Sequence, residues 1–196
     1  MPLLLSPINT KRLCLLPATL KLYLQELYDL PAFASALNAY VPEEWPPDQI
    51  TPEVIEDFIG RIQARERKIW SFYWILRQKD PEQSILIGNG GFLAHKNGTF
   101  EIGYSLLAKY HSRGYATEAV QSMVQWASSS LKRDRIVAYT YPHMKASIRV
   151  LEKNSFLLKG KGPEEGTIAY EFFNVDENPI SGSIEVQVKD VFTENN

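Results

Sequence analysis

The sequence has one cysteine, three histidines and no long apolar run, and each of these scarcities excludes a class of protein. The lone thiol of Cys14 cannot form an internal disulfide, and it fits a reducing compartment. The histidines at positions 95, 111 and 143 lack the spacing of metal ligands, so we expect no metal site. No apolar stretch approaches the roughly 20 residues that span a bilayer, and the apolar start at residues 1–7 is too short and uncharged for a good signal peptide. The sequence therefore predicts a cytoplasmic protein with no membrane segment.

Charge and length set further limits. The 21 Lys and Arg residues nearly balance the 23 Asp and Glu residues, so the formal net charge is −2 and nucleic-acid binding through a basic field is not expected. A chain of 196 residues with 44% hydrophobic content can bury the core of one globular domain, which we expect to cover residues 1–174. Residues 175–196 are polar and without clear helical periodicity. We expect them either to be a partly disordered tail or to add an edge strand at residues 184–188.

The spacing of apolar residues predicts three helices in the first third of the chain and mostly strands after them. Residues 11–16 are the expected first strand, and a helix is expected to begin at Pro17, where a missing N–H costs little. A second helix is expected near residues 32–39, and a third after Thr51 as N-cap with Pro52 at the first helical position. Further strands are expected at residues 69–77, 85–94, 99–106 and 135–141, then a helix at 145–154 and a closing hairpin of residues 156–159 and 167–173.

The stretch from residue 103 to residue 127 organises the chain, and it reads GYSLLAKYHSRGYATEAVQSMVQWA. Apolar residues recur there at helical spacing: Ala116, Ala119, Val120, Met123, Val124 and Ala127. The helix that they predict crosses between the fourth and fifth strands, at residues 99–106 and 135–141, so these two strands should be parallel. The expected fold class is α/β (α+β), with a mixed, mostly antiparallel central sheet and helices on both faces.

The start of this helix is suited to an anion. Gly114 and Ala116 are small, and a helix start offers unpaired backbone N–H groups and the positive end of the helix dipole. No Gly-Lys-Ser/Thr follows, which excludes a P-loop, and the three-glycine spacing of a dinucleotide-binding turn is absent. The residues therefore predict a phosphate-binding turn that follows a strand.

Two segments resemble the GNAT superfamily of N-acetyltransferases, and within it the branch of the ribosomal-protein N-terminal acetyltransferases. In the first, EIGY at residues 101–104 precedes HSRGYA at residues 111–116, where the branch has Arg/Gln-x-x-Gly-x-Gly/Ala. The second, ASIRVLEKNSF at residues 146–156, is similar to the branch's Asn-x-x-Ser-x-x-Val-Leu-Glu-Lys-x-Gly-Phe. The likeness covers roughly residues 10–173, and it implies the GNAT fold with the fourth and fifth strands splayed apart.

The resemblance implies acetyl-CoA as co-substrate. The N–H groups of residues 112–117 would hold its pyrophosphate and Arg113 would add positive charge. Backbone left free at Leu106 would bond the pantetheine arm, and a backbone N–H in that region would be the oxyanion donor. The residues implied in cofactor binding are Leu106, His111, Ser112, Arg113, Gly114, Tyr115, Ala116, Thr117, Met144 and Ser147.

Acetyl transfer also needs a deprotonated amine, and Glu101 is our candidate general base. The alternative is that Glu101 only pairs with Lys or Arg, or holds the acceptor. Glu164 or Glu165 is a second choice of base, although both lie in a loop expected to be solvated. Ser147 is the candidate donor to the leaving thiolate, and its alternative role is a helix-start hydroxyl that caps the backbone. The tyrosine that many GNAT enzymes place four residues later is Leu151 here.

The implied activity is transfer of an acetyl group from acetyl-CoA to a primary amine, by direct attack in a ternary complex. The acceptor would be a protein N-terminal α-amine or a small-molecule amine, and the resemblance also allows a homodimer. Three residues depart from the family: His111 replaces Arg or Gln, Met144 replaces an Asn that would bond the pantetheine arm, and Ser155 replaces Gly. Because Met144 cannot make an amide contact, a non-catalytic acyl-CoA-binding or regulatory module stays open, as does transfer of another acyl group.

Two other features have alternatives of their own. Trp45 lies in a proline-rich loop, where it either faces the acceptor or packs the loop onto the core. The glycine-rich run at residues 88–91 leads into a strand rather than a helix, which indicates a bulge or a close strand approach instead of a phosphate site.

Overall fold

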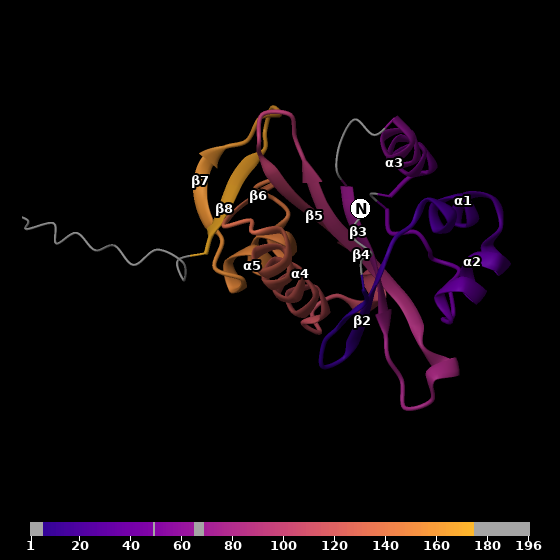
Figure 1. The fold of residues 1–196 in the computed structure, drawn as a ribbon. Coiled ribbons are helices and arrows are strands. Elements are labelled where there is room, and N and C mark those ends of the chain that lie inside the picture. Colours follow the sequence, from indigo (N-terminus) through magenta and orange to yellow (C-terminus); the bar gives the residue numbers. More distant parts are fainter. Residues whose placement is uncertain (1–5, 49, 65–68, 175–196) are drawn as a thin grey trace, which may run out of the picture.

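The computed structural model describes residues 6–48, 50–64 and 69–174, and they form an eight-stranded sheet with helices on both sides (Figure 1). The strands are β1 Ile8–Asn9, β2 Leu13–Pro17, β3 Ile69–Leu76, β4 Ile85–Ala94, β5 Phe100–Leu106, β6 Arg135–Thr140, β7 Leu157–Lys161 and β8 Ile168–Phe173. The helices are α1 Leu20–Tyr28, α2 Leu30–Leu37, α3 Pro52–Ala64, α4 Tyr115–Leu131 and α5 Lys145–Lys153, with 3₁₀ turns η1 Pro81–Gln83 and η2 Ala108–Tyr110. The predictions for residues 175–196 lie outside the described residues.

The strand order across the sheet is β1-β2-β3-β4-β5-β6-β8-β7. All neighbouring pairs are antiparallel except β5 and β6, which are parallel and are joined through α4. The predicted fourth and fifth strands are therefore β5 and β6, and the expected fold class is confirmed. Four hairpins, β1–β2, β3–β4, β4–β5 and β7–β8, join antiparallel neighbours through short connections, whereas the parallel neighbours β5 and β6 need the long connection through α4.

The first helix begins later than the sequence suggested. We expected Pro17 to start it, but Pro17 is the last residue of β2 and pairs with Phe72. Thr19 is the N-cap of α1, and its hydroxyl accepts a hydrogen bond from the Leu22 N–H at 3.2 Å. A threonine that satisfies an unpaired N–H is a better helix start than a proline whose neighbours are already in a strand.

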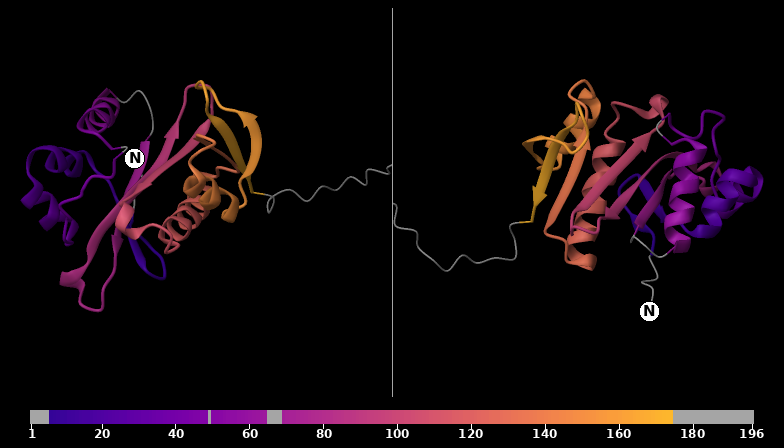
Figure 2. Two further views of the ribbon diagram at one scale, coloured as in Figure 1. Left: turned by 180° about the vertical axis from the view of Figure 1, so that it is seen from behind. Right: turned by 90° about the horizontal axis from the view of Figure 1, so that it is seen from above.

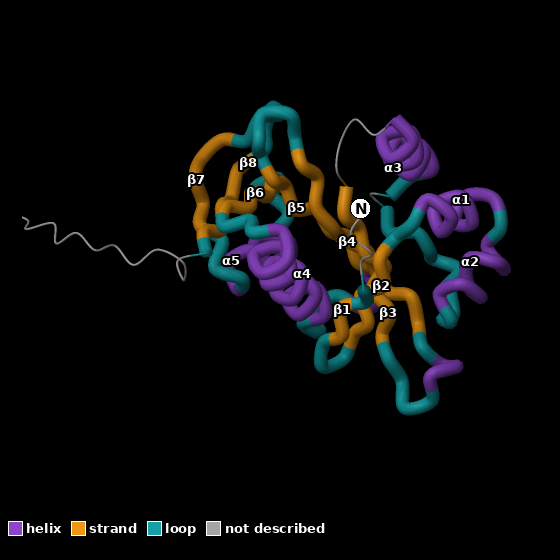
Figure 3. Tube along the Cα trace, viewed as in Figure 1, coloured by secondary structure: helices purple, strands orange, loops and turns teal. Residues whose placement is uncertain are grey.

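The helices divide between the two faces of the sheet (Figures 1 and 2). Helices α1, α2 and α3 lie on one side, and α4 and α5 lie on the other; the tube in Figure 3 shows the same division. Side chains of a strand point alternately to the two faces of the sheet, so strand β3 contributes to the packing against the helices on both sides. Phe72 meets the Trp126 ring of α4 with centroids 5.3 Å apart, whereas Tyr73 meets the Phe33 ring of α2 at 5.1 Å. Burial of such a side chain contributes roughly 1.5–3 kcal/mol.

The glycine-rich run at residues 88–91 is packed tightly against its neighbours. A Cβ atom added at Gly91 would lie 2.1 Å from the Trp70 carbonyl oxygen, and one at Gly88 would lie 2.6 Å from that of Ser105. The expectation of a close strand approach is confirmed, because only glycine leaves room for the neighbouring backbone. No helix of the described residues is long and apolar enough to span a membrane.

Candidate active site

A large cleft opens where β5 and β6 diverge. The two strands pair in register at Glu101 and Val137, while β5 stays paired with β4 as far as Leu106 opposite Gly88. The cleft has a volume of about 1140 Å³. It is lined by β5 from residue 101 onward, the end of β6, the start of α4 and one side of α5, together with the β4–β5 hairpin at His95, Asn97 and Thr99, the connection from β5 to α4 and two loops at residues 44–48 and 163–167. The volume of the cleft exceeds the roughly 300–1,000 Å³ of ordinary ligand pockets, so it has room for an extended ligand and a second molecule.

The predicted phosphate-binding turn lies at one end of the cleft. Its backbone bends through left-handed conformations at Ser112, with φ of 59°, and at Gly114, with φ of 78°. Gly114 is the N-cap of α4, and no side chain caps this helix start. Of residues 111–117, all except Arg113 line the cleft. The N–H groups of the first turn of α4 are thus available to an anion.

Arg12, in the turn between β1 and β2, supports this loop from about a hundred residues away. Its Nη1 donates to the Arg113 carbonyl at 2.8 Å, and its guanidinium lies 4.3 Å from the centre of the Tyr115 ring. Its Nε donates to Glu118 Oε2 at 2.6 Å and its backbone N–H donates to Glu118 Oε1 at 2.7 Å. Burial alone would raise the pKa of the Glu118 carboxyl, but the hydrogen bonds from Thr10 and Arg12 outweigh it and lower that pKa. Glu118, the acidic residue in the first turn of α4, therefore keeps its negative charge, and Arg12 compensates that charge.

His111 closes part of the strand edge that we expected to be free. Its Nε2 donates to the Leu106 carbonyl oxygen at 2.9 Å, because a carbonyl can only accept. The expectation of open backbone at Leu106 is therefore wrong for the carbonyl group in this structure. The histidine that departs from the family pattern has a definite role, which is to hold the connection between β5 and α4.

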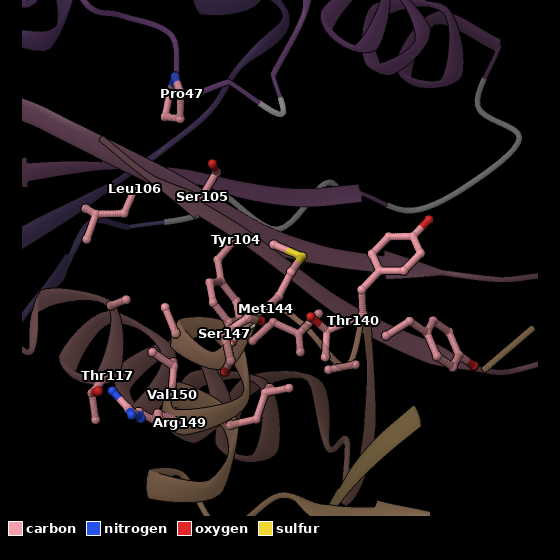
Figure 4. A pocket seen from close by; sticks show the side chains of 18 of the residues that line it. Pro47, Tyr104, Ser105, Leu106, Thr117, Thr140, Met144, Ser147, Arg149 and Val150 are labelled. Carbon is pink, nitrogen blue, oxygen red and sulfur yellow. Dashed lines mark hydrogen bonds between the residues drawn. The ribbon is translucent and has the colours of Figure 1, made fainter. Parts of the chain in front are cut away.

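Polar side chains of β5, β6 and α5 meet in the middle of the cleft (Figure 4). The Tyr104 hydroxyl lies 3.2 Å from Ser147 Oγ and donates to the Ser147 carbonyl at 3.1 Å. Burial raises the pKa of Tyr104 to about 12, so its hydroxyl keeps its proton at neutral pH. Met144, the N-cap of α5, also lines the cleft. The sequence identified Ser147 and Met144 but missed Tyr104.

Thr140, at the end of β6, was also missed. It lines the cleft with only 5% of its surface exposed, and its Oγ1 has no hydrogen-bond partner among the described residues. A buried hydroxyl without a partner costs roughly 1–3 kcal/mol, so such groups in native proteins are usually paired with something. Thr140 thus lines the cleft with a buried hydroxyl that has no partner among the described residues.

Glu101 lies at the point where β5 and β6 begin to separate. Its Oε2 lies 2.7 Å from His95 Nε2, and both side chains are a little over one-quarter exposed, at 29% and 28%. The alternative of a Lys or Arg partner is not what the structure shows, because the partner is a histidine. Glu164 also lines the cleft and is exposed, whereas Glu165 is exposed and does not line it.

The chain was also compared with models of known protein families. Residues 12–157 match the family model described as an acetyltransferase (GNAT) domain. The chain belongs to the GNAT acetyltransferase family. The resemblance inferred from residues 101–116 and 146–156 is thereby confirmed at the level of the family.

Named relatives of this GNAT chain are N-acetyltransferases. It is 34% identical over 93 residues to the uncharacterized N-acetyltransferase YjdG of Bacillus subtilis, covering 46% of this chain and 54% of YjdG. It is 29% identical over 147 residues to the uncharacterized N-acetyltransferase YnaD of the same species, covering 74% of this chain and 79% of YnaD. The match thus spans about half the length of YjdG and about four-fifths of YnaD.

The GNAT fold is shared with RimL, a ribosomal L7/L12 α-N-protein acetyltransferase solved in complex with coenzyme A. The TM-score is 0.59 at 19% sequence identity, and the match covers 86% of this chain and 98% of RimL. At this identity the likeness shows the fold alone. Ribosomal-protein acetyltransferases are therefore structural neighbours, as the suspected branch predicts.

The positive charges of the cleft in this GNAT chain differ from the sequence prediction. Arg113 does not line the cleft; its guanidinium lies 6.0 Å from the centre of the Tyr110 ring. Two cations of α5 line it instead, Arg149 and Lys153. Helix α5 is held to the start of α4 by Asn154, whose Nδ2 donates to the Thr117 carbonyl at 3.3 Å. Arg149 and Lys153 are four residues apart on one helix, and this spacing was the sequence signal that could have placed both cations on the same face of α5.

Trp45 packs onto the core instead of facing the acceptor. Its side chain is buried, and its Nε1 donates to Glu26 Oε1 at 2.8 Å. Tyr73 donates to the other oxygen of the same carboxylate at 2.5 Å. The anchored loop places Glu44, Pro47 and Asp48 at the edge of the cleft.

Among the described residues there is no group of three or more His, Cys, Asp or Glu side chains that could hold a metal ion.

Proposed function

We propose that the protein transfers an acetyl group from acetyl-CoA to a primary amine, by direct attack of the amine in a ternary complex. The observation that carries this proposal is the cleft between the splayed strands, which ends at the uncapped start of α4. The N–H groups of residues 112–117 would hold the pyrophosphate, with Arg149 and Lys153 supplying the charge that we first expected from Arg113. The N-acetyltransferase names of YjdG and YnaD and the CoA complex of RimL support the same donor.

The chemistry requires that an amine nitrogen attack the thioester carbonyl and that the carbon–sulfur bond then break. The neutral amine nitrogen loses one proton as the amide forms. The sulfur leaves as a thiolate, which takes up one proton and ends as the thiol of CoA. Glu101 is positioned to take a proton from the nitrogen, with His95 holding its carboxylate. The Ser147 hydroxyl, which contacts Tyr104 in this structure, would turn to donate a hydrogen bond to the thiolate. Holding both substrates side by side supplies much of the rate.

The proposed acceptor is a primary amine, and a protein N-terminal α-amine is one source. An α-amine has a pKa of about 7.7–8.0, so it needs less help from a base than a lysine amine at about 10.4. The name of RimL, an α-N-protein acetyltransferase, supports this source. A cytoplasmic location and a homodimer remain predictions.

The test is release of free CoA from acetyl-CoA by the purified protein in the presence of a panel of peptide and small-molecule amines. Amine-dependent release with mass-spectrometric detection of the acetylated amine is the expected result. Absence of CoA or acetyl-CoA binding at millimolar ligand in calorimetry would refute the proposal. Met144 at the start of α5 favours a second candidate, a non-catalytic acyl-CoA-binding module, and binding without turnover of any amine would support it. Assays in which different acyl-CoAs compete for the same amine would show whether the protein prefers an acyl group other than acetyl.

Replacing Glu101 with glutamine should lower kcat/KM for the amine about 100-fold at neutral pH, since a general base contributes roughly 10²–10⁴ in rate. Affinity for CoA should not change, because the variant keeps the shape of the side chain. Steady-state kinetics from pH 7 to 10 should show the deficit shrinking as the amine loses its proton unaided. Glu165→Gln is the matched control, being exposed and away from the cleft. A loss of less than about 3-fold would leave Glu101 as an acceptor contact only.

Replacing Thr140 with valine should weaken CoA binding about 3- to 10-fold, which is what one hydrogen bond of about 1 kcal/mol contributes. The reason is that Thr140 lines the cleft and that its buried Oγ1 has no partner among the described residues, so we propose that this hydroxyl bonds the pantetheine arm when the cofactor is bound. Calorimetry should show unchanged affinity for 3′,5′-ADP, which lacks the arm, and Thr140→Ser should bind CoA like the original protein. Equal losses for CoA and 3′,5′-ADP would mean that Thr140 acts only on the fold.

A further inference from the structure

A second cavity lies on the other side of β5, beneath helices α1 and α3. It has a volume of about 310 Å³, and we call it the side chamber. Its walls come from Tyr23, from Ile50 and Phe58 around α3, and from the facing residues of β3, β4 and β5. At the lower end of ligand-pocket sizes, it has room for one compact group rather than a nucleotide or a folded peptide.

The side chamber and the cleft meet along β5. Four residues line both of them: Glu101, Gly103, Tyr104 and Ser105. In a strand, alternate side chains share a face, so Glu101 and Ser105 point to the same side as the position of Gly103. A Cβ atom added at Gly103 would have no other atom within 4 Å. The chamber therefore has open space directly beside Glu101.

The walls of the chamber are mostly apolar and partly aromatic. The Tyr23 and Phe58 rings lie 6.0 Å apart and are tilted by 55°, and Ile50, Ile69 and Leu93 add aliphatic surface. Burial raises the pKa of Tyr23 far above its usual value, so its phenol stays uncharged. Such walls favour an apolar group, and their polar members are the Ser71, Asn89 and Ser105 side chains with the Glu101 carboxylate at the junction.

The charged side chains that line the cleft come from different elements. The acidic ones are Glu101 of β5, which also lines the side chamber, and Glu44, Asp48 and Glu164 of the two loops. The cations Arg149 and Lys153 lie on α5. An ammonium group is attracted to the carboxylates, among them Glu101 at the junction, whereas an anionic cofactor is attracted to the cations of α5.

We propose that the acceptor is a primary amine that carries a compact apolar group, preferably aromatic, close to its nitrogen. The nitrogen lies beside Glu101 in the cleft and the apolar group fills the side chamber. This inference rests on the proposed function, because it names the acceptor of the same reaction. Both a free arylalkylamine and the N-terminus of a peptide beginning with an aromatic residue present this chemistry.

The test compares amines that differ only in the apolar group. With acetyl-CoA saturating, kcat/KM for 2-phenylethylamine should exceed that for ethylamine about 10- to 100-fold, since burial of a phenyl group contributes roughly that factor. A peptide beginning with Phe and one beginning with Ser form a second arm. A larger preference within the peptide pair assigns the site to protein termini, and a larger preference within the small amines assigns it to free amines. Ethylamine or spermidine turning over at least as fast as 2-phenylethylamine, with no preference for Phe, would overturn the inference while leaving the proposed function intact.

A variant that fills the chamber provides the second readout. Gly103→Leu places a side chain in the open space, so the ratio of kcat/KM for 2-phenylethylamine to that for ethylamine should fall at least 10-fold. Gly60→Leu is the matched control, because Gly60 is exposed on α3 and also has no atom within 4 Å of an added Cβ. Phe58→Ala enlarges the chamber instead, and it should shift the preference from 2-phenylethylamine to the bulkier tryptamine.

A binding experiment keeps the inference separate from catalysis. Calorimetric titration of 2-phenylethylamine into the protein saturated with CoA should show binding that Gly103→Leu weakens and Gly60→Leu leaves unchanged. If CoA binds but 2-phenylethylamine does not, the side chamber does not hold the acceptor. If CoA itself does not bind, the proposed function fails first.

Discussion

Gly114→Glu is expected to lower the affinity for CoA at least 100-fold. Gly114 has φ of 78° and is the N-cap of α4, at the end of the cleft where the backbone N–H groups face the predicted pyrophosphate. A carboxylate about 4 Å from a phosphate charge is repelled by roughly 1–4 kcal/mol, depending on the effective dielectric constant, and the side chain also occupies the space of the anion. A 100-fold loss corresponds to about 2.7 kcal/mol. Isothermal titration calorimetry with CoA measures the effect.

The matched control for this variant is Gly98→Glu. Gly98 has a similar backbone conformation, with φ of 87°, and no atom within 4 Å of an added Cβ. It lies in the hairpin between β4 and β5 and does not itself line the cleft. The control carries the same change in charge and the same backbone strain, so unchanged CoA affinity is expected. Equal affinities for both variants would remove the loop at residues 111–117 from the binding site.

Glu26→Leu is expected to lower the free energy of unfolding by roughly 2–5 kcal/mol. The Glu26 carboxylate is buried with 7% exposed, and it accepts from Trp45 Nε1 at 2.8 Å and from the Tyr73 hydroxyl at 2.5 Å. Leucine leaves both donors buried and without their acceptor, and each unpaired polar group costs about 1–3 kcal/mol. Thermal or urea denaturation measures the loss. Because Trp45 anchors the loop that carries Asp48 to the cleft, KM for the amine should also rise.

The pH dependence of stability distinguishes the charge of Glu26 from its hydrogen bonds. Burial raises the pKa of Glu26 above its ordinary 4.5, and the hydrogen bonds from Tyr73 and Trp45 offset this only in part. The folded protein therefore binds the proton more tightly than the unfolded chain. As pH rises from about 4.5 through the raised folded pKa, the stability gained from the protonated form is lost. Glu26→Gln keeps an acceptor but has no titration, so its stability relative to the original protein should increase over that window. A constant difference at every pH would contradict the assigned shift.

Much of the site was predictable because it depends on local patterns. The strand, the small residues Gly114 and Ala116 and the periodic helix after them specify an uncapped helix start within one short segment. The register of β5 against β4 follows from a short hairpin. Ser147 and Glu101 were identified from their places in the two family segments, and both line the cleft. Their roles in catalysis stay predictions.

The residues that sequence reasoning missed belong to contacts between distant segments. Arg12 donates to the Arg113 carbonyl and to Glu118, and no pattern in the sequence predicts a partner that lies about a hundred residues away. Thr140 and Tyr104 looked like ordinary strand residues, and only the divergence of β5 from β6 exposes them to the cleft. Arg113 was expected to add charge to a phosphate; in the structure it is exposed and does not line the cleft, and its guanidinium lies 6.0 Å from the centre of the Tyr110 ring.

The sequence by itself determined the parallel pair, the helix start that follows the strand and, except for the two-residue strand β1, the order of helices and strands, because these depend on periodicity, helix-start chemistry and the length of connections. Only the tertiary structure decided which charges reach the cleft, that Trp45 is an anchor and that a mostly apolar chamber adjoins Glu101. The physical reason is that side-chain surroundings depend on how far two strands splay and on what packs behind them, and these are set by long-range packing of the whole sheet.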